Sequence, residues 1–181
     1  KGVGAGFAPD PYPEFGQCVH KIVRHPKAPG RLYMQNHGGW ADWTGPGGPR
    51  PNIGVLRSDD YGRSWRSIAA GLPSDFGFPI VVDPADSDSA YVIPLIGAED
   101  RTTPGGSVRV WETRDAGATW AARGNGLPER DAYLTVLREA FDSAGAGSGL
   151  ELYFGATSGE VYGSGDAGAN WAPVAAHLPP V

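Results

Sequence analysis

Short apolar runs separated by turn-forming residues recur along the whole chain. Runs of this length, rich in β-branched residues and bounded by Pro, Gly or Asp, predict short β-strands. Three of these short runs predict buried inner strands, over residues 20–24, 78–82 and 133–137. Second strands are expected over 31–35, 90–94 and 150–154, and third strands over 53–57, 107–113 and 160–163.

A motif, Ser/Thr-x-Asp-x-Gly-x-x-Trp, occurs three times, at 58–65, 113–120 and 164–171. Its aspartates lie 55 and then 51 residues apart, which indicates an internal repeat. The pattern predicts a hairpin turn in which Asp accepts backbone N–H groups, Gly adopts positive φ, and Trp opens a fourth strand and covers the turn. We therefore assign a structural role to Ser58, Asp60, Gly62, Trp65, Thr113, Asp115, Gly117, Trp120, Ser164, Asp166, Gly168 and Trp171.

Four strands in about 50 residues match one blade of a β-propeller. We expect an all-β chain with three four-stranded antiparallel blades, at 17–71, 75–126 and 131–176. Residues 1–16 are expected to form a loop that closes a preceding blade, and 177–181 to lead into the next. Three blades do not close a ring, so the expected partners include further propeller blades or a second copy.

The repeated motif is that of the Asp-box, or BNR, repeat. The chain resembles the Asp-box propeller superfamily, which includes sialidases, the sortilin ectodomain, xyloglucanase-type glycosidases and photosystem-assembly-factor-like proteins. Residues 11–20 and 178–181 are similar to a bacterial group labelled glycosyl hydrolase or sialidase-like. The resemblance implies a propeller with its site on the face opposite the Asp-boxes. The chain has no Arg-Ile-Pro motif, so sialidase chemistry is not supported.

Composition narrows the function classes. The chain contains 6 Trp, 7 Tyr and 6 Phe, which argues against disorder, while 28 Gly and 17 Pro favour many turns. A net charge of −5 without a basic run argues against nucleic-acid binding, and no apolar stretch is long enough to span a membrane. Because Cys18 is the one cysteine and the four His show no ligand spacing, we expect no metal and no cofactor. The chain starts at Lys1 rather than Met, so we expect an excerpt or a processed product.

Candidate functional residues lie in the loops that enter each inner strand and in those between the second and third strands. Carboxylates beside exposed aromatics suit carbohydrate binding, and paired carboxylates suit glycoside hydrolysis. The candidate catalytic residues are Asp75, Asp131 and Glu14. The candidate ligand-binding residues are Gln17, His20, His37, Trp40, Trp43, Asp100, Arg101, Arg130 and Tyr133.

Aligning the three inner strands places Gln17, Asp75 and Arg130 at one equivalent position of the repeat. The alternative interpretation is structural: Trp40 and Trp43 pin a long loop, and the acids are solvated. The chain is thus expected to bind or hydrolyse a glycan at the mouth of the channel. The alternative is a non-enzymatic scaffold that binds a protein or peptide there.

Overall fold

The computed structural model describes residues 17–38, 54–97 and 99–179, and its strands form three four-stranded antiparallel sheets. The first sheet contains β1 (Gln17–Arg24), β2 (Leu32–Gly38), β3 (Val55–Ser58) and β4 (Arg66–Ser67). The second contains β5 (Gly77–Asp83), β6 (Asp86–Pro94), β7 (Val110–Thr113) and β8 (Ala121–Arg123). The third contains β9 (Phe141–Ala144), β10 (Glu151–Gly155), β11 (Val161–Ser164) and β12 (Ala172–Ala175).

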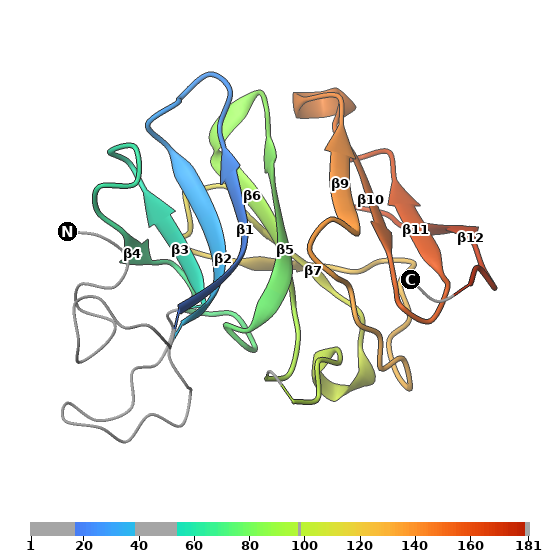
Figure 1. Ribbon diagram of the computed structural model, residues 1–181. Helices are drawn as coiled ribbons and strands as arrows, with labels where there is room; N and C mark the ends of the chain where they lie inside the picture. The colour runs from blue at the N-terminus through green and yellow to red at the C-terminus, as the bar shows by residue number, and fades with distance from the viewer. Residues whose placement is uncertain (1–16, 39–53, 98, 180–181) are drawn as a thin grey trace.

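The sheets stand side by side, with the second between the first and the third (Figure 1). Each neighbouring pair encloses apolar side chains: Ile80, Val82 and Val92 pack with Tyr33 of the first sheet, and Tyr91 packs with residues of the third. Each sheet is a meander in chain order. The chain therefore has the all-β fold of a partial propeller, as predicted. Neither of the two three-residue 3-10 helices, η1 (Pro104–Gly106) and η2 (Gly147–Gly149), could cross a bilayer, and the described residues hold no longer helix.

The three motif turns, at 58–65, 113–120 and 164–171, have the same pattern of hydrogen bonds. In the first, the Ser58 hydroxyl donates to Asp60 Oδ1 and accepts from the backbone N–H of Gly62, both at 2.8 Å. Asp60 also accepts from the backbone N–H of Ser64 at 2.8 Å and from its hydroxyl at 2.6 Å. The same bonds recur around Asp115 and Asp166, with Thr119 and Asn170 in the place of Ser64.

Two consecutive residues with positive φ make each motif turn tight. Tyr61 and Gly62 have φ of 61° and 82°, as a type I′ hairpin turn requires at its two central positions. The corresponding residues in the other turns, Ala116 with Gly117 and Ala167 with Gly168, also have positive φ. Glycine occupies the second position, where φ is 82° to 88°, beyond the left-handed region near 60° that Tyr61, Ala116 and Ala167 adopt at the first position.

Hydrogen bonds to the motif aspartates favour their ionised form. The Ser64 hydroxyl and backbone N–H, followed by the Ser58 hydroxyl, lower the pKa of Asp60 to about 2. Thr119 and Thr113 lower the pKa of Asp115 to about 2 in the same way, and Asn170 and Ser164 lower that of Asp166. These carboxylates are occupied within their own turns, which agrees with a structural role.

The predicted inner strand at 133–137 is wrong. The third sheet begins instead at Phe141, and residues 133–137 have no ladder partner. Leu134 and Val136 are nevertheless buried, so the apolar run fills the core as expected. Its backbone bonds to a loop, since the Thr157 N–H donates to the Thr135 carbonyl at 2.9 Å. Arg130 therefore lies about ten residues before β9 and is not the repeat equivalent of Gln17 and Asp75.

The fourth strands start one residue later than predicted, at Arg66, Ala121 and Ala172. The motif tryptophans directly precede these strands. Trp171 is buried, whereas Trp65 and Trp120 are half-buried. The indole N–H of Trp65 and of Trp171 donates to the motif glycine carbonyl at 3.0 Å.

Candidate functional site

The candidate site lies at the end of the sheets opposite the motif turns. In Figure 1 the β3–β4 turn stands at the upper end of the first sheet, and the loop between β6 and β7 lies at the lower end of the second. Four exposed side chains from two loops define what we call the channel-mouth surface: Arg101, Asp131, Tyr133 and Arg138. Loops carried on a rigid sheet scaffold are a common place for binding residues.

A buried aromatic cluster supports this surface. The His20 ring lies 4.5 Å from the Phe78 ring and 5.6 Å from the Phe76 ring, measured between centroids. His20 Nδ1 lies 2.6 Å from the Gly77 carbonyl oxygen, so this nitrogen carries the proton and donates it. All three rings are less than 10% exposed. The structure thus places His20, a predicted ligand-binding residue, beneath the surface, where it joins the first sheet to the second.

Two guanidinium groups cover the same aromatic ring. Arg101 Cζ lies 5.8 Å from the Phe78 centroid, and Arg138 Cζ lies 5.5 Å from it. These distances are within the range of cation–π attraction. Arg101 comes from the β6–β7 loop and Arg138 from the segment that leads into β9, so Phe78 brings together side chains that are distant in sequence. Sequence reasoning missed Arg138, because the inner strand of the third sheet was placed too early.

Asp131 and Tyr133 stand on a segment fastened to the η1 loop. The Ala132 N–H donates to the Gly106 carbonyl at 2.9 Å, and Thr103 Oγ1 donates to the Ala132 carbonyl. Asp131 has a φ of 57°, and Tyr133 is 62% exposed. A Cβ on Gly106 would lie 3.0 Å from Tyr133 Cζ, so this glycine leaves room for the tyrosine ring. The exposed ring is therefore held by close backbone packing.

Asp75 ties the first sheet to the second. It is half-buried, and its Oδ2 accepts from the Gly54 N–H at 3.1 Å. Its carbonyl accepts from Gln35 Nε2 at 3.0 Å, while the same amide group donates to the Gly54 carbonyl. A Cβ on Gly54 would come within 1.8 Å of the Asp75 carbonyl oxygen, so the two loops touch here. Asp131, in contrast, is solvent-exposed and lies within the channel-mouth surface.

The other predicted residues fall into three groups. Asp100 and Arg130 are exposed on the two loops that carry Arg101 and Asp131. Gln17 is the first residue of β1, and His37 is the next-to-last residue of β2, where the two strands pair. Glu14, Trp40 and Trp43 lie outside the described residues. Across the described ranges, no group of three His, Cys, Asp or Glu side chains could hold a metal ion.

No protein-family model matches the chain, and no curated protein sequence matches it. Solved structures do match its fold. An ancestral GH74 enzyme superposes over 88% of this chain with a TM-score of 0.58 and 15% identity, and the GH74 xyloglucanase from Xanthomonas campestris over 90% with 0.56 and 23%. YCF48 bound to D1 peptide superposes over 93% with 0.57 and 12% identity.

This chain covers 19% of the ancestral enzyme, 24% of the xyloglucanase and 43% of YCF48, so it spans less than half of each. At these identities the likeness shows a shared propeller fold and nothing about a shared site.

Proposed function

We propose that this protein is part of an Asp-box propeller and binds a carbohydrate on its channel-mouth surface. The observation that carries the proposal is the Tyr133 ring, which is 62% exposed on the segment that carries Asp131. Thr135 of the same segment donates its hydroxyl to the Arg101 carbonyl and so joins the segment to the loop of Arg101. An exposed aromatic ring offers a flat apolar face to the C–H groups of a sugar. Arginine and aspartate beside it supply donors and acceptors for sugar hydroxyl groups.

The Asp-box assignment rests on the three motif turns, whose Ser/Thr, Asp and Gly make the same hydrogen bonds each time. Two of the structural neighbours are GH74 enzymes, one of them a xyloglucanase, which makes a carbohydrate a sensible first ligand to test. Propellers of one fold bind different ligands, so the experiment tests the channel-mouth residues themselves.

The test is calorimetric titration of the protein with a xyloglucan oligosaccharide. We expect Tyr133→Ala to weaken binding at least tenfold, because the stacking face is lost. Tyr153→Ala is the matched control, since Tyr153 is also exposed but lies on the third sheet, away from the channel-mouth loops. Equal affinity for the parent and the Tyr133 variant would overturn the proposal.

The proposal extends to hydrolysis with Asp131 as the acid most open to a substrate and Asp75 and Glu14 as the candidate second carboxylates. Glycoside hydrolysis uses two carboxyl groups on either side of the scissile bond. Asp131→Asn is expected to abolish release of reducing sugar while oligosaccharide binding remains within about twofold. Unchanged turnover in that variant would remove Asp131 from catalysis and leave binding as the function.

Peptide binding is the second candidate. It is favoured by Arg138, whose guanidinium lies exposed over Phe78 and can meet a peptide carboxylate. A propeller of similar fold has been solved with a D1 peptide bound. An acidic decapeptide that binds the parent protein, and that loses affinity in Arg138→Gln but not in Tyr133→Ala, would establish this candidate instead if the oligosaccharide does not bind.

A further inference from the structure

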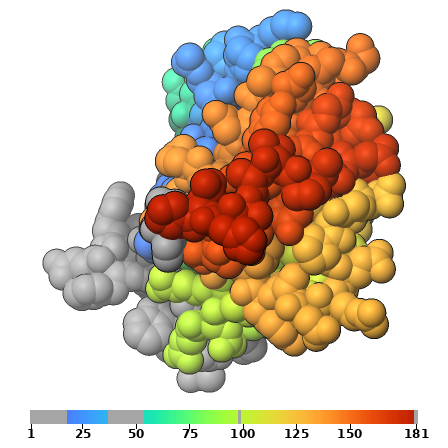
Figure 2. Space-filling view, turned by 90° about the vertical axis from the view of Figure 1, so that its right-hand side faces the viewer, coloured from blue at the N-terminus to red at the C-terminus, as the bar shows by residue number. Residues whose placement is uncertain are grey.

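A turn that follows β8 joins the second sheet to the third. Residues 124–127 form it: the Leu127 N–H donates to the Gly124 carbonyl at 2.9 Å, and Gly126 has a φ of 87°, as the third residue of a type II turn requires. Asn125 directly precedes this glycine and is exposed. Figure 2 shows the golden chain after β8 lying against the red strands of the third sheet.

Asn125 forms a side-chain pair with Asn170 of the third motif turn. Asn125 Nδ2 donates to Asn170 Oδ1 at 2.5 Å, and Asn170 Nδ2 donates to Asp166 Oδ2 at 2.7 Å. The ionised Asp166 carboxylate only accepts hydrogen bonds, so it fixes which way the Asn170 amide points. The oxygen of that amide therefore faces residue 125, and it finds a partner only if residue 125 is a donor.

The two exposed asparagines of this pair differ in the residue that follows them. Asparagine is among the chemically labile residues of proteins, because the backbone nitrogen of the next residue can attack its Cγ. Gly126 has no side chain to hinder the attack, and its N–H makes no hydrogen bond among the described residues. Asn170 is followed by the bulky Trp171, whose N–H donates to the Asn125 carbonyl at 2.8 Å. Asn125 is thus open to the reaction and Asn170 is protected from it.

We propose that Asn125 is a site of spontaneous deamidation. The Gly126 nitrogen loses its proton to a solvent base and bonds to Asn125 Cγ, while the side-chain nitrogen takes up a proton and leaves as ammonia. The product is a five-membered succinimide ring. Water then opens the ring at either carbonyl. Cleavage of the new bond to Cγ gives aspartate, and cleavage of the original peptide bond gives isoaspartate, with no change in oxidation state.

Both products weaken the connection between the sheets. Aspartate turns an acceptor toward Asn170 Oδ1, which is also an acceptor, and an Asn170 amide that rotates to donate to it gives up its bond to Asp166. Isoaspartate adds a methylene group to the main chain where there is no free space, since a Cβ on Gly126 would lie 2.1 Å from the Trp171 carbonyl oxygen.

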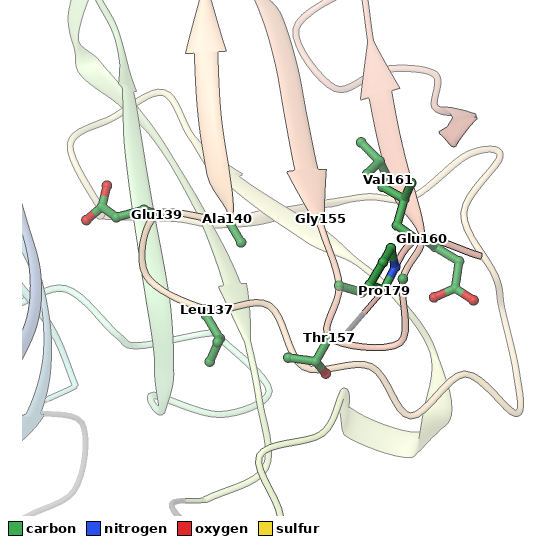
Figure 3. Close-up of a pocket in the computed structure, with 11 residues that line it drawn as sticks. Leu137, Glu139, Ala140, Gly155, Thr157, Glu160, Val161 and Pro179 are labelled. Carbon is green, nitrogen blue, oxygen red and sulfur yellow. The ribbon is translucent and has the colours of Figure 1, made fainter. Parts of the chain in front are cut away.

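The third sheet should respond most to this loss. Within the described part of the chain it has the second sheet on one side and no sheet on the other (Figure 1). Its outer face carries Tyr153 and Val174, which are 40% and 61% exposed, and a pocket of about 390 Å³ lined by Leu137, Val161 and Leu178 among others (Figure 3). Contacts with the second sheet therefore hold it in place, and β12, which follows Trp171, should loosen first.

Peptide mapping by mass spectrometry, after ageing of the folded protein in mildly alkaline buffer, tests the modification. We expect Asn125 to convert to a mixture of aspartate and isoaspartate at least ten times faster than Asn170 in the same sample. Asn125→Gln is the control and should stay unmodified over the same period, because its longer side chain would have to close a larger ring. Conversion of Asn125 no faster than that of Asn170 would overturn the proposal.

Asn125→Asp fixes one product in place and tests its structural effect. Amide hydrogen exchange measured by NMR should accelerate at least tenfold at Trp171 and in β12, and should be unchanged in β1 and β2. No acceleration at Trp171 and β12 would overturn the proposed loosening.

A second background isolates the role of Asn170. Thr119 takes its place in the second motif turn and donates its hydroxyl to Asp115, so Asn170→Thr keeps a donor for Asp166 and removes the oxygen that faces residue 125. Asn125→Asp should therefore accelerate exchange much less in Asn170→Thr than in the parent. Equal acceleration on both backgrounds would overturn the conflict between Asp at 125 and Asn170 as its cause.

Discussion

The two ends of the sheets differ in how their side chains are used. At one end, three motif turns repeat the same Ser/Thr–Asp–Gly network, and each carboxylate is bonded within its own loop. At the other end, the loops differ in length and composition, and the contacts of exposed residues such as Tyr133 and Arg138 are not repeated among the described residues of the other sheets. Repetition thus accompanies folding, and divergence accompanies the candidate site.

Substitutions at the motif end should lower the free energy of unfolding, and substitutions at the channel mouth should leave it nearly unchanged. The largest expected effect is at Trp171, which is 5% exposed and lies 5.3 Å from Phe154 between ring centroids. Trp171→Ala should lower the free energy of unfolding by about 3–5 kcal/mol, as for other buried aromatic truncations. Urea denaturation measures it. Trp65→Ala, at the half-buried equivalent, should cost less, and an equal cost would contradict the burial difference.

Replacing the motif glycines by alanine should lower the free energy of unfolding by different amounts, and this difference is smaller than the effect at Trp171. Gly62→Ala and Gly117→Ala share the strain of a positive φ, worth about 1–2 kcal/mol. A Cβ at Gly117 would also lie 2.5 Å from the Cβ of Ile68, the residue after β4, whereas at Gly62 the nearest atom is 3.4 Å away. Overpacking should add about 1–3 kcal/mol at Gly117 alone. Equal melting temperatures for the two variants would show that the contact with Ile68 relaxes freely.

The sequence could predict the motif end because its chemistry is local. Ser58, Asp60, Gly62 and Ser64 bond to one another within a few residues, so a short pattern is sufficient to identify the turn and count the sheets. The short apolar run at 133–137 predicted a strand, but an apolar run indicates burial and not a hydrogen-bonding partner. That partner is a loop residue, Thr157, and the strand starts only at Phe141.

The channel mouth was less predictable because its contacts are distant in sequence. Loop composition predicted binding residues at this end, where Arg101, Asp131 and Tyr133 are exposed, and their role stays a prediction. The aromatic support of His20 on Phe76 and Phe78 depends on how two sheets pack, and no local pattern encodes it. The Arg138 guanidinium lies over Phe78, which is 60 residues earlier in the chain.

Acid should weaken the motif end through its aspartates. Their pKa is lowered in the folded protein, to about 2 for Asp60 and Asp115 against an ordinary value of 3.8. Their stabilising contribution is therefore complete above about pH 4 and is lost as the pH falls toward 2. The effect should be modest, because these carboxylates are exposed to solvent screening. Urea midpoints between pH 5 and pH 2.5 measure it, and Asp60→Asn with Asp115→Asn should flatten the profile; an unchanged slope would contradict the assignment.

The smallest stability effect is expected at the channel mouth. Tyr133 and Asp131 are exposed, and their side chains protrude from a segment that the backbone bond between Ala132 and Gly106 already holds. Tyr133→Ala and Asp131→Asn should therefore change the free energy of unfolding by no more than about 0.5 kcal/mol, as surface substitutions usually do. Thermal and urea unfolding of both variants measure this beside the binding titration. A loss of more than 1 kcal/mol in Tyr133→Ala would mean that the ring stabilises the η1 loop, so that weaker ligand binding in that variant would reflect folding and the two ends would no longer differ in kind.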